Sequence, residues 1–108
     1  MSIPKKVKRK VHERSGGQCE ICGSTRGLQH HHIVKKSQCG PDTADNIILL
    51  CWEHHHGTYG VHGREGSELD RKLKLQLQEK YFEQGKSEKE VRKLMGNRLY
   101  IDEAGDFN

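Results

Sequence analysis

Apolar positions spaced four apart predict a long helix in the C-terminal third of the chain. This spacing places side chains on one face of an α-helix. The face consists of Leu69, Leu73, Leu77 and Tyr81. We expect Ser67 to cap the start of the helix and Gly85 to end it. A leucine stripe of this kind is far more often a packing surface than a partner site, so we interpret it as core.

A second C-terminal helix is predicted directly after the first. Ser87 and Glu90 have the three-residue spacing of a capping box, in which each side chain bonds the other's backbone N–H. The helix that they open carries Val91 and stops at Gly96. The two C-terminal helices therefore span about residues 67–96.

The N-terminal part of the chain predicts a basic helix over about residues 4–14. Val7 and Val11 share one face of it, and Pro4 suits its first turn. Gly16 follows at its end, where a glycine commonly stops a helix.

The central part of the chain predicts short strands and loops. Residues 28–34 and the apolar run 47–50 have strand length, and the polar segment 35–46 between them is a loop. A short helix is expected to open at residues 51–56, and three glycines then mark residues 57–63 as an irregular, mobile segment.

The composition indicates a small domain that needs a metal. The chain has 108 residues, of which 31% are hydrophobic, and it contains four cysteines and eight histidines. So little apolar surface gives a small core, which a bound metal can supplement. No apolar run reaches the ~18 residues of a membrane span, and the first residues lead into lysines rather than into a signal peptide. We therefore expect a cytoplasmic location, where cysteines are metal ligands before they are disulfides.

The charge distribution favours a nucleic-acid partner. Lys and Arg number 19 against 15 Asp and Glu, which gives a net charge of +4. The basic residues expected to contact phosphates are Lys5, Lys6, Lys8, Arg9, Lys10, Lys35, Lys36 and Arg64. A basic arm attracts polyanions, although a solvated helix face would have the same composition.

Two short motifs predict a structural zinc site. Cys19 and Cys22 are separated by two residues, as are Cys51 and His54. Zinc prefers four tetrahedral nitrogen or sulfur ligands, and this spacing lets both side chains of each pair reach one ion. Cys39 is the rival fourth ligand, but it has no neighbouring partner, so we interpret it as a free or weakly buried thiol.

The remaining histidines exceed what one zinc requires. They include His30, His31, His32, His55, His56 and His62. In a strand His31 faces away from His30 and His32, so one face can bind a metal while the other addresses solvent or substrate. An unligated histidine beside a metal is a natural general base, because its ordinary pKa lies near neutrality.

The order of these motifs over about residues 5–63 resembles the HNH endonucleases, most of all the small zinc-containing branch found in phages and restriction systems. The resemblance rests on the Cys-x2-Cys-Gly knuckle, the His-His-Ile signature, the Asn46 before an apolar strand, and the second knuckle. It implies an α+β fold with a treble-clef-like ββα-metal core stapled by a structural zinc. A single nuclease domain over residues 1–108 would then have its core at about 15–63, between the N-terminal and C-terminal helices.

The resemblance also implies roles for individual residues. His31 matches a metal ligand, and His32 matches the general base, which Asn46 would orient through hydrogen bonds. His55 matches the next metal ligand. His62 is the expected last ligand, with His56 as its substitute, and His30 has no matching role.

The implied activity is the hydrolysis of DNA phosphodiester bonds with low sequence specificity, by nicking or by double-strand cleavage. A histidine base and a single divalent ion (Mg²⁺, Mn²⁺, Ni²⁺, Co²⁺ or Zn²⁺) would carry it out, in a monomer or a homodimer. The likeness to phage nucleases further implies a role in DNA packaging with a terminase or another packaging protein. The alternative is a zinc-stapled nucleic-acid-binding module that cleaves nothing; it does not need His31, His32, Asn46 and His55 together.

Overall fold

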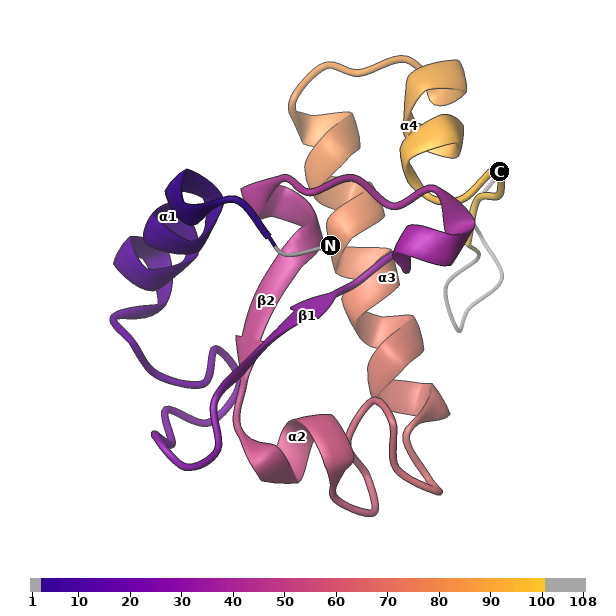
Figure 1. Cartoon of the computed structure of the whole chain (residues 1–108). Helices are drawn as coiled ribbons and strands as arrows, with labels where there is room; N and C mark the ends of the chain where they lie inside the picture. The colour runs from indigo at the N-terminus through magenta and orange to yellow at the C-terminus, as the bar shows by residue number, and fades with distance from the viewer. Residues whose placement is uncertain (1–2, 101–108) are drawn as a thin grey trace.

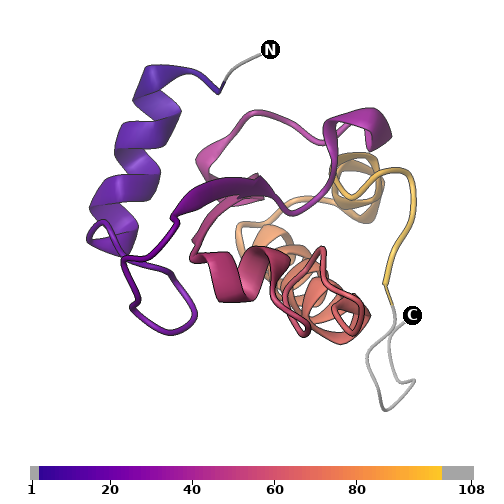
Figure 2. The same ribbon diagram turned by 60° about the horizontal axis from the view of Figure 1, so that its bottom comes forward.

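A two-stranded antiparallel hairpin lies between helices on its two sides (Figures 1 and 2). The structure is a computed structural model that describes residues 3–100. Its helices are α1 (Lys5–Ser15), α2 (Trp52–His56), α3 (Ser67–Glu83) and α4 (Glu88–Leu94), and its strands are β1 (Gln29–His32) and β2 (Ile47–Leu50). Two short 3-10 turns, Lys36–Gln38 and Ala44–Asn46, lie in the connection between the strands. The α+β class is confirmed, and the hairpin followed by α2 gives the ββα order.

Successive side chains of β2 enter two different packing regions. Ile47 and Leu49 are buried against Val7 and Val11 of α1, whereas Leu50 is buried beside the cysteines on the other side of the hairpin. This alternation follows from the period of two along a strand. The hairpin therefore has a face covered by α1 and a face covered by the rest of the molecule (Figure 2).

The larger core lies between the end of the hairpin and the C-terminal helices. Val34 packs there with α3 and α4. Helix α3 contributes the buried side chains of Leu73, Leu77 and Tyr81 to this core. Val91 of α4 and Met95, which directly follows α4, are buried there too. The interpretation of the leucine stripe as core is confirmed, with Leu69 only partly buried at its edge.

The ends of the helices follow the sequence signals except at the start of α3. Ser87 and Glu90 form the predicted capping box at α4. Ser67, however, is the first residue of α3 rather than its cap, and Gly66 occupies the cap position. A Cβ on Gly66 would lie 1.8 Å from the carbonyl oxygen of Gly60, so only glycine fits there. The prediction of Ser67 as the cap is wrong because this close approach depends on the tertiary fold.

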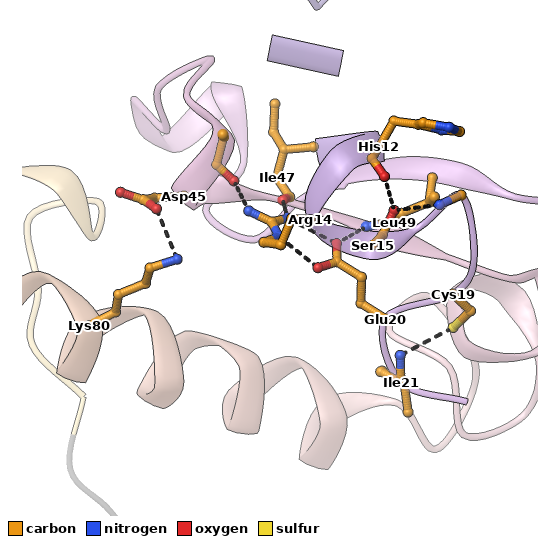
Figure 3. A network of polar contacts seen from close by, with 12 residues as sticks. His12, Arg14, Ser15, Cys19, Glu20, Ile21, Asp45, Ile47, Leu49 and Lys80 are labelled. Atoms are coloured by element: carbon orange, nitrogen blue, oxygen red, sulfur yellow. Dashed lines mark hydrogen bonds and ion pairs between the residues drawn. The ribbon is translucent and has the colours of Figure 1, made fainter. Parts of the chain in front are cut away.

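Arg14 ties α1 to the hairpin and to the loop that follows the helix (Figure 3). Its guanidinium donates to both carboxylate oxygens of Glu20, at 2.7 and 2.9 Å. It also donates to the carbonyl oxygens of Ala44 at 2.8 Å and Ile47 at 2.6 Å. Glu20 in turn accepts the backbone N–H of Leu49 at 2.8 Å. One side chain thus closes a polar network across three segments.

We expect Arg14→Ala to lower the free energy of unfolding by about 2–3 kcal/mol, because hydrogen bonds to charged groups are worth more than neutral ones and Glu20 loses its main partner. Urea unfolding of the zinc-loaded protein measures the change. Lys10→Ala, an exposed position on the same helix, serves as the control and should change stability by less than about 0.5 kcal/mol. Equal losses in the two variants would contradict the network.

None of the helices within residues 3–100 combines the length and the apolar character that crossing a bilayer requires.

Candidate metal centres and active site

Four side chains gather where the loop after α1 meets the start of α2. The ligand atoms of Cys19, Cys22, Cys51 and His54 all lie within 4.8 Å of one another. The sulfurs of Cys22 and Cys51 are 3.7 Å apart, and Nδ1 of His54 lies 3.3 Å from the sulfur of Cys51. Two sulfurs of a tetrahedral site with Zn–S bonds of about 2.3 Å are about 3.8 Å apart. The geometry of this Cys3His cluster therefore fits zinc.

The loop around Cys19 prepares its sulfur for a metal. Gly23 adopts a φ of +80°, which brings its N–H to the carbonyl of Cys19 at 2.9 Å and turns the chain back. Burial alone raises the pKa of Cys19, but hydrogen bonds from nearby backbone N–H groups and from Cys51 lower that pKa to about 6. The thiolate, which is the form that binds metal, is thus favoured. Cys39 is exposed and lies outside this cluster, so His54 and not Cys39 completes it.

A second cluster consists of histidines from three segments. His31 of β1, His55 of α2 and His62 of the following loop place one ring nitrogen each within 4.8 Å of the others. Their ring centroids are 4.7–5.2 Å apart. His56, the substitute for His62, is exposed and is not part of this group.

The state of these rings fits a metal site. His31 is 6% exposed, and its buried Nε2 has no hydrogen-bond partner among the described residues. Buried polar atoms are nearly always paired, so an orphaned one that faces two other imidazoles points to an absent ligand. Burial, followed by the neighbouring histidines, lowers the pKa of His31 to about 3 and that of His55 to about 4. Both rings are therefore neutral at pH 7, which is the form that binds metals.

The glycine-rich segment between α2 and α3 brings His62 to this cluster. Backbone N–H groups of Gly60, Gly63 and Gly66 each bond the carbonyl three residues earlier, at 2.8–3.1 Å. The N–H of His62 bonds the carbonyl of His55 at 2.8 Å. A Cβ on Gly63 would lie 1.8 Å from the carbonyl oxygen of Gly57. The predicted irregular segment is therefore a tight series of turns, which spans the seven positions from His55 to His62 without a continuous helix.

Gln29 fixes the ring of His55. Its side-chain oxygen accepts a hydrogen bond from Nδ1 of His55 and another from Nε2 of His56, the second at 3.1 Å. Because an amide oxygen only accepts, Nδ1 of His55 carries the proton and Nε2 is left for a metal. No sequence motif predicted a role for Gln29. The available signal was its position two before His31, which puts both on one face of β1.

We expect Gln29→Ala to weaken Mn²⁺ binding to the histidine cluster by about 10–100-fold, because outer hydrogen bonds to metal ligands contribute on this scale. Isothermal titration calorimetry on protein that retains its zinc measures the dissociation constant. Gln76→Ala, exposed on α3, is the matched control. An unchanged constant in Gln29→Ala would remove the residue from the site.

His32 lies beside the histidine cluster without joining it. It lines the same hollow, of about 270 Å³, as His31, His55 and His62. Its Nε2 donates to Oδ1 of Asp42 at 2.7 Å, and Lys36 donates to the other oxygen of that carboxylate at 3.0 Å. The hydrogen bond from His32 has the largest effect on Asp42, followed by that from Lys36. Both lower the pKa of Asp42 and keep its carboxylate ionised. Asp42 was not foreseen from the sequence, because it lies ten positions after His32, in the loop between the strands.

Asn46 holds the backbone near His32 rather than the ring of His32 itself. It is fully buried. Its side-chain oxygen accepts the N–H of Val34 at 2.8 Å, and its amide donates to the carbonyls of Val34 at 3.0 Å and Pro41 at 2.9 Å. The expected hydrogen bond between Asn46 and the ring of His32 is absent from the described residues, where Asp42 makes that contact. Asn46 thus fixes the end of the strand and the loop that carries Asp42.

The basic residues fall into separate groups. Those of α1, namely Lys5, Lys6, Lys8, Arg9 and Lys10, are all exposed. Lys35 and Lys36 line the hollow of the histidine cluster. Arg64 lies in the loop after His62, with its side chain 86% exposed and 4.0 Å from Glu65, and it is not among the described residues that line the hollow.

Comparison with known proteins agrees with this geometry. Residues 19–58 match the model of the HNH endonuclease family. That segment contains the complete Cys3His cluster, the hairpin and α2, and it ends four residues before His62. No curated protein and no solved structure matches the chain. Residues 19–58 are therefore similar to an HNH endonuclease domain, and this likeness covers the Cys3His cluster, the hairpin and α2.

Proposed function

We propose that the protein is a metal-dependent endonuclease that hydrolyses DNA phosphodiester bonds with low sequence specificity, by nicking or by cutting both strands. The observation that carries this proposal is the group of His31, His55 and His62, in which a buried nitrogen has no partner. A fourth imidazole, that of His32, lines the same hollow without joining the group. A site that only binds nucleic acid has no need for this arrangement.

His31, His55 and His62 are the residues that would hold the catalytic ion. Three neutral imidazoles leave coordination positions open, unlike the four ligands of a structural site. Such a set accepts Mn²⁺, Co²⁺, Ni²⁺ and Zn²⁺, and Mg²⁺ with lower affinity. When bound, the ion supplies electrostatic stabilisation of the charge that develops on the phosphate and on the leaving 3′ oxygen.

His32 is the proposed general base. Since its Nε2 donates to Asp42, Nδ1 is the nitrogen that is free to accept the proton of the attacking water. The water oxygen forms a bond to phosphorus as the bond to the 3′ oxygen breaks. The carboxylate of Asp42 then stabilises the charged ring, as a carboxylate does beside a catalytic histidine elsewhere.

The two proposed metal sites have different roles, the Cys3His cluster a structural one and the histidine cluster a catalytic one. The Cys3His cluster would hold a structural zinc that joins the loop after α1 to the start of α2. Lys35 at the hollow, with some of the basic residues of α1, would hold phosphates and give salt-dependent, weakly specific binding. A cytoplasmic location remains a prediction from the sequence pattern, and a role in phage packaging beside a terminase remains a prediction from the resemblance.

Incubation with supercoiled plasmid tests the proposed activity. We expect the purified, zinc-loaded protein to convert the plasmid to nicked or linear forms with Mg²⁺, Mn²⁺ or Ni²⁺, and not with EDTA. His31→Leu should abolish this conversion, whereas His56→Ala should retain it, because His56 lies outside the group. Retarded but uncut plasmid with every metal would instead favour the non-catalytic binding module.

A further inference from the structure

A second hollow, of about 500 Å³, lies between α1 and the hairpin. Lys5, Lys8 and Arg9 form its cationic wall, and His12 and His30 also line it. No acidic side chain is among the described residues that line it. Glu20 acts on His30 from outside the hollow, and Arg14 already holds that carboxylate. The hollow therefore offers an anion three full positive charges.

The basic residues of α1 are divided between two faces of the helix. Lys5, Lys8, Arg9 and His12 have the spacing i, i+3, i+4 and i+7, which places them together. Val7 and Val11 occupy the buried face. Lys6 and Lys10 lie on a different exposed face of the helix from these four residues, and they do not line the hollow.

His30 connects this hollow to the candidate active site. It lines both the hollow beside α1 and the hollow of the histidine cluster. The alternation along β1 turns His31 toward the metal cluster and His30 toward the α1 side. Lys8 of α1 and His30 line the same hollow, so a phosphate there can reach both side chains. The two hollows thus share His30 as a lining residue, and we call the pair of hollows the path.

We propose that this path binds the DNA strand that flanks the scissile phosphate. Lys5, Lys8 and Arg9 contact successive backbone phosphates, and His30 donates a ring N–H to a phosphate at the junction of the two hollows. From Lys5 to His12 the helix rises about 10 Å, close to the rise of about three nucleotides. Lys6 and Lys10 make no contact with this DNA strand. Fewer basic residues of α1 therefore bind phosphates than the composition predicts. The inference rests on the proposed nuclease function for the position of the scissile phosphate.

Matched charge removals on α1 test the path. The variant Lys5→Gln/Lys8→Gln and the variant Lys6→Gln/Lys10→Gln each remove two charges from the same helix, and glutamine keeps the helix propensity. The dissociation constant for a fluorescent 20-base-pair duplex is measured by anisotropy over a salt series, with zinc retained and no catalytic metal added. Circular dichroism and zinc content confirm that the variants are folded. Lys89→Gln/Lys93→Gln on α4 controls for net charge.

We expect Lys5→Gln/Lys8→Gln to weaken binding at least tenfold at low salt, and to reduce the salt slope by about 1.8, the value for two lost phosphate contacts. The Lys6/Lys10 and Lys89/Lys93 variants should bind within about twofold of the parent protein. His30→Ala should raise KM for plasmid more than it lowers kcat. Equal losses in the two α1 variants, or no binding by the parent protein, would overturn the path.

The same measurements separate this inference from the nuclease proposal. Face-selective binding without cleavage under any metal would support the phosphate contacts of Lys5 and Lys8 and refute the nuclease. Cleavage that persists while both α1 variants lose binding equally would refute the path and leave the nuclease.

Discussion

His32→Ala should lower metal-dependent DNA cleavage by about 10²–10⁴-fold, the usual contribution of a general base. The ring of His32 lines the hollow of the histidine cluster but is held by Asp42 rather than by the ligand group. Its loss therefore removes the proton acceptor while His31, His55 and His62 remain. The measurement is the initial rate of plasmid nicking with saturating Mn²⁺, together with zinc content and the midpoint of thermal unfolding.

The control for His32→Ala is His56→Ala, which also removes one imidazole near the site. His56 is exposed and outside the ligand group, so its variant should keep the parent rate within a few-fold. Mn²⁺ affinity of His32→Ala should also stay within a few-fold of the parent value. Normal nicking by His32→Ala would remove His32 from the mechanism, and a large loss of Mn²⁺ affinity would make it a ligand instead of a base.

Cys19→Ser should prevent stable folding. Cys19 is 3% exposed and belongs to the Cys3His cluster. Structural zinc sites contribute on the order of 10–16 kcal/mol to folding in small peptides, which exceeds what a chain with 31% hydrophobic residues is expected to gain from its core. We therefore expect loss of bound zinc, loss of a cooperative thermal transition and aggregation on purification. Zinc per chain and the circular dichroism melt are the readouts.

Cys39→Ser is the matched control, since it makes the same substitution at an exposed thiol outside the cluster. It should retain one tightly bound zinc and the parent melting midpoint. A chelator strong enough to remove zinc should unfold the parent protein and Cys39→Ser alike. A stable, zinc-replete Cys19→Ser would show that the cluster is not what holds the fold.

The sequence predicted the features of the fold that local chemistry determines. The capping box at Ser87 and the strand over residues 47–50 depend on neighbouring residues, and both are confirmed. The start of α3 does not depend on local signals alone, because Gly66 is required by the carbonyl of Gly60 across a folded loop. The sequence does not reveal this contact between Gly60 and Gly66, so it favours Ser67 as the cap.

The candidate site shows the same division. The zinc ligands could be selected by their spacing and the histidine ligands by the resemblance to the HNH endonucleases, and the two clusters that form contain the seven side chains expected of them. Their supporting residues could not be selected, because Gln29 and Asp42 reach the histidines only after the hairpin and its loop have folded. Asn46 was assigned a contact with His32, but a buried amide bonds whichever backbone groups the fold leaves unpaired, and here those belong to Val34 and Pro41.

The most direct test of the account is anomalous diffraction from crystals grown with excess Mn²⁺. We expect a zinc peak among Cys19, Cys22, Cys51 and His54, and a separate manganese peak bonded to nitrogens of His31, His55 and His62. The ring of His32 should point into the same hollow with no bond to either ion. A manganese ion bonded to His32, or no ion at the three histidines, would contradict the hydrolytic role proposed for this site.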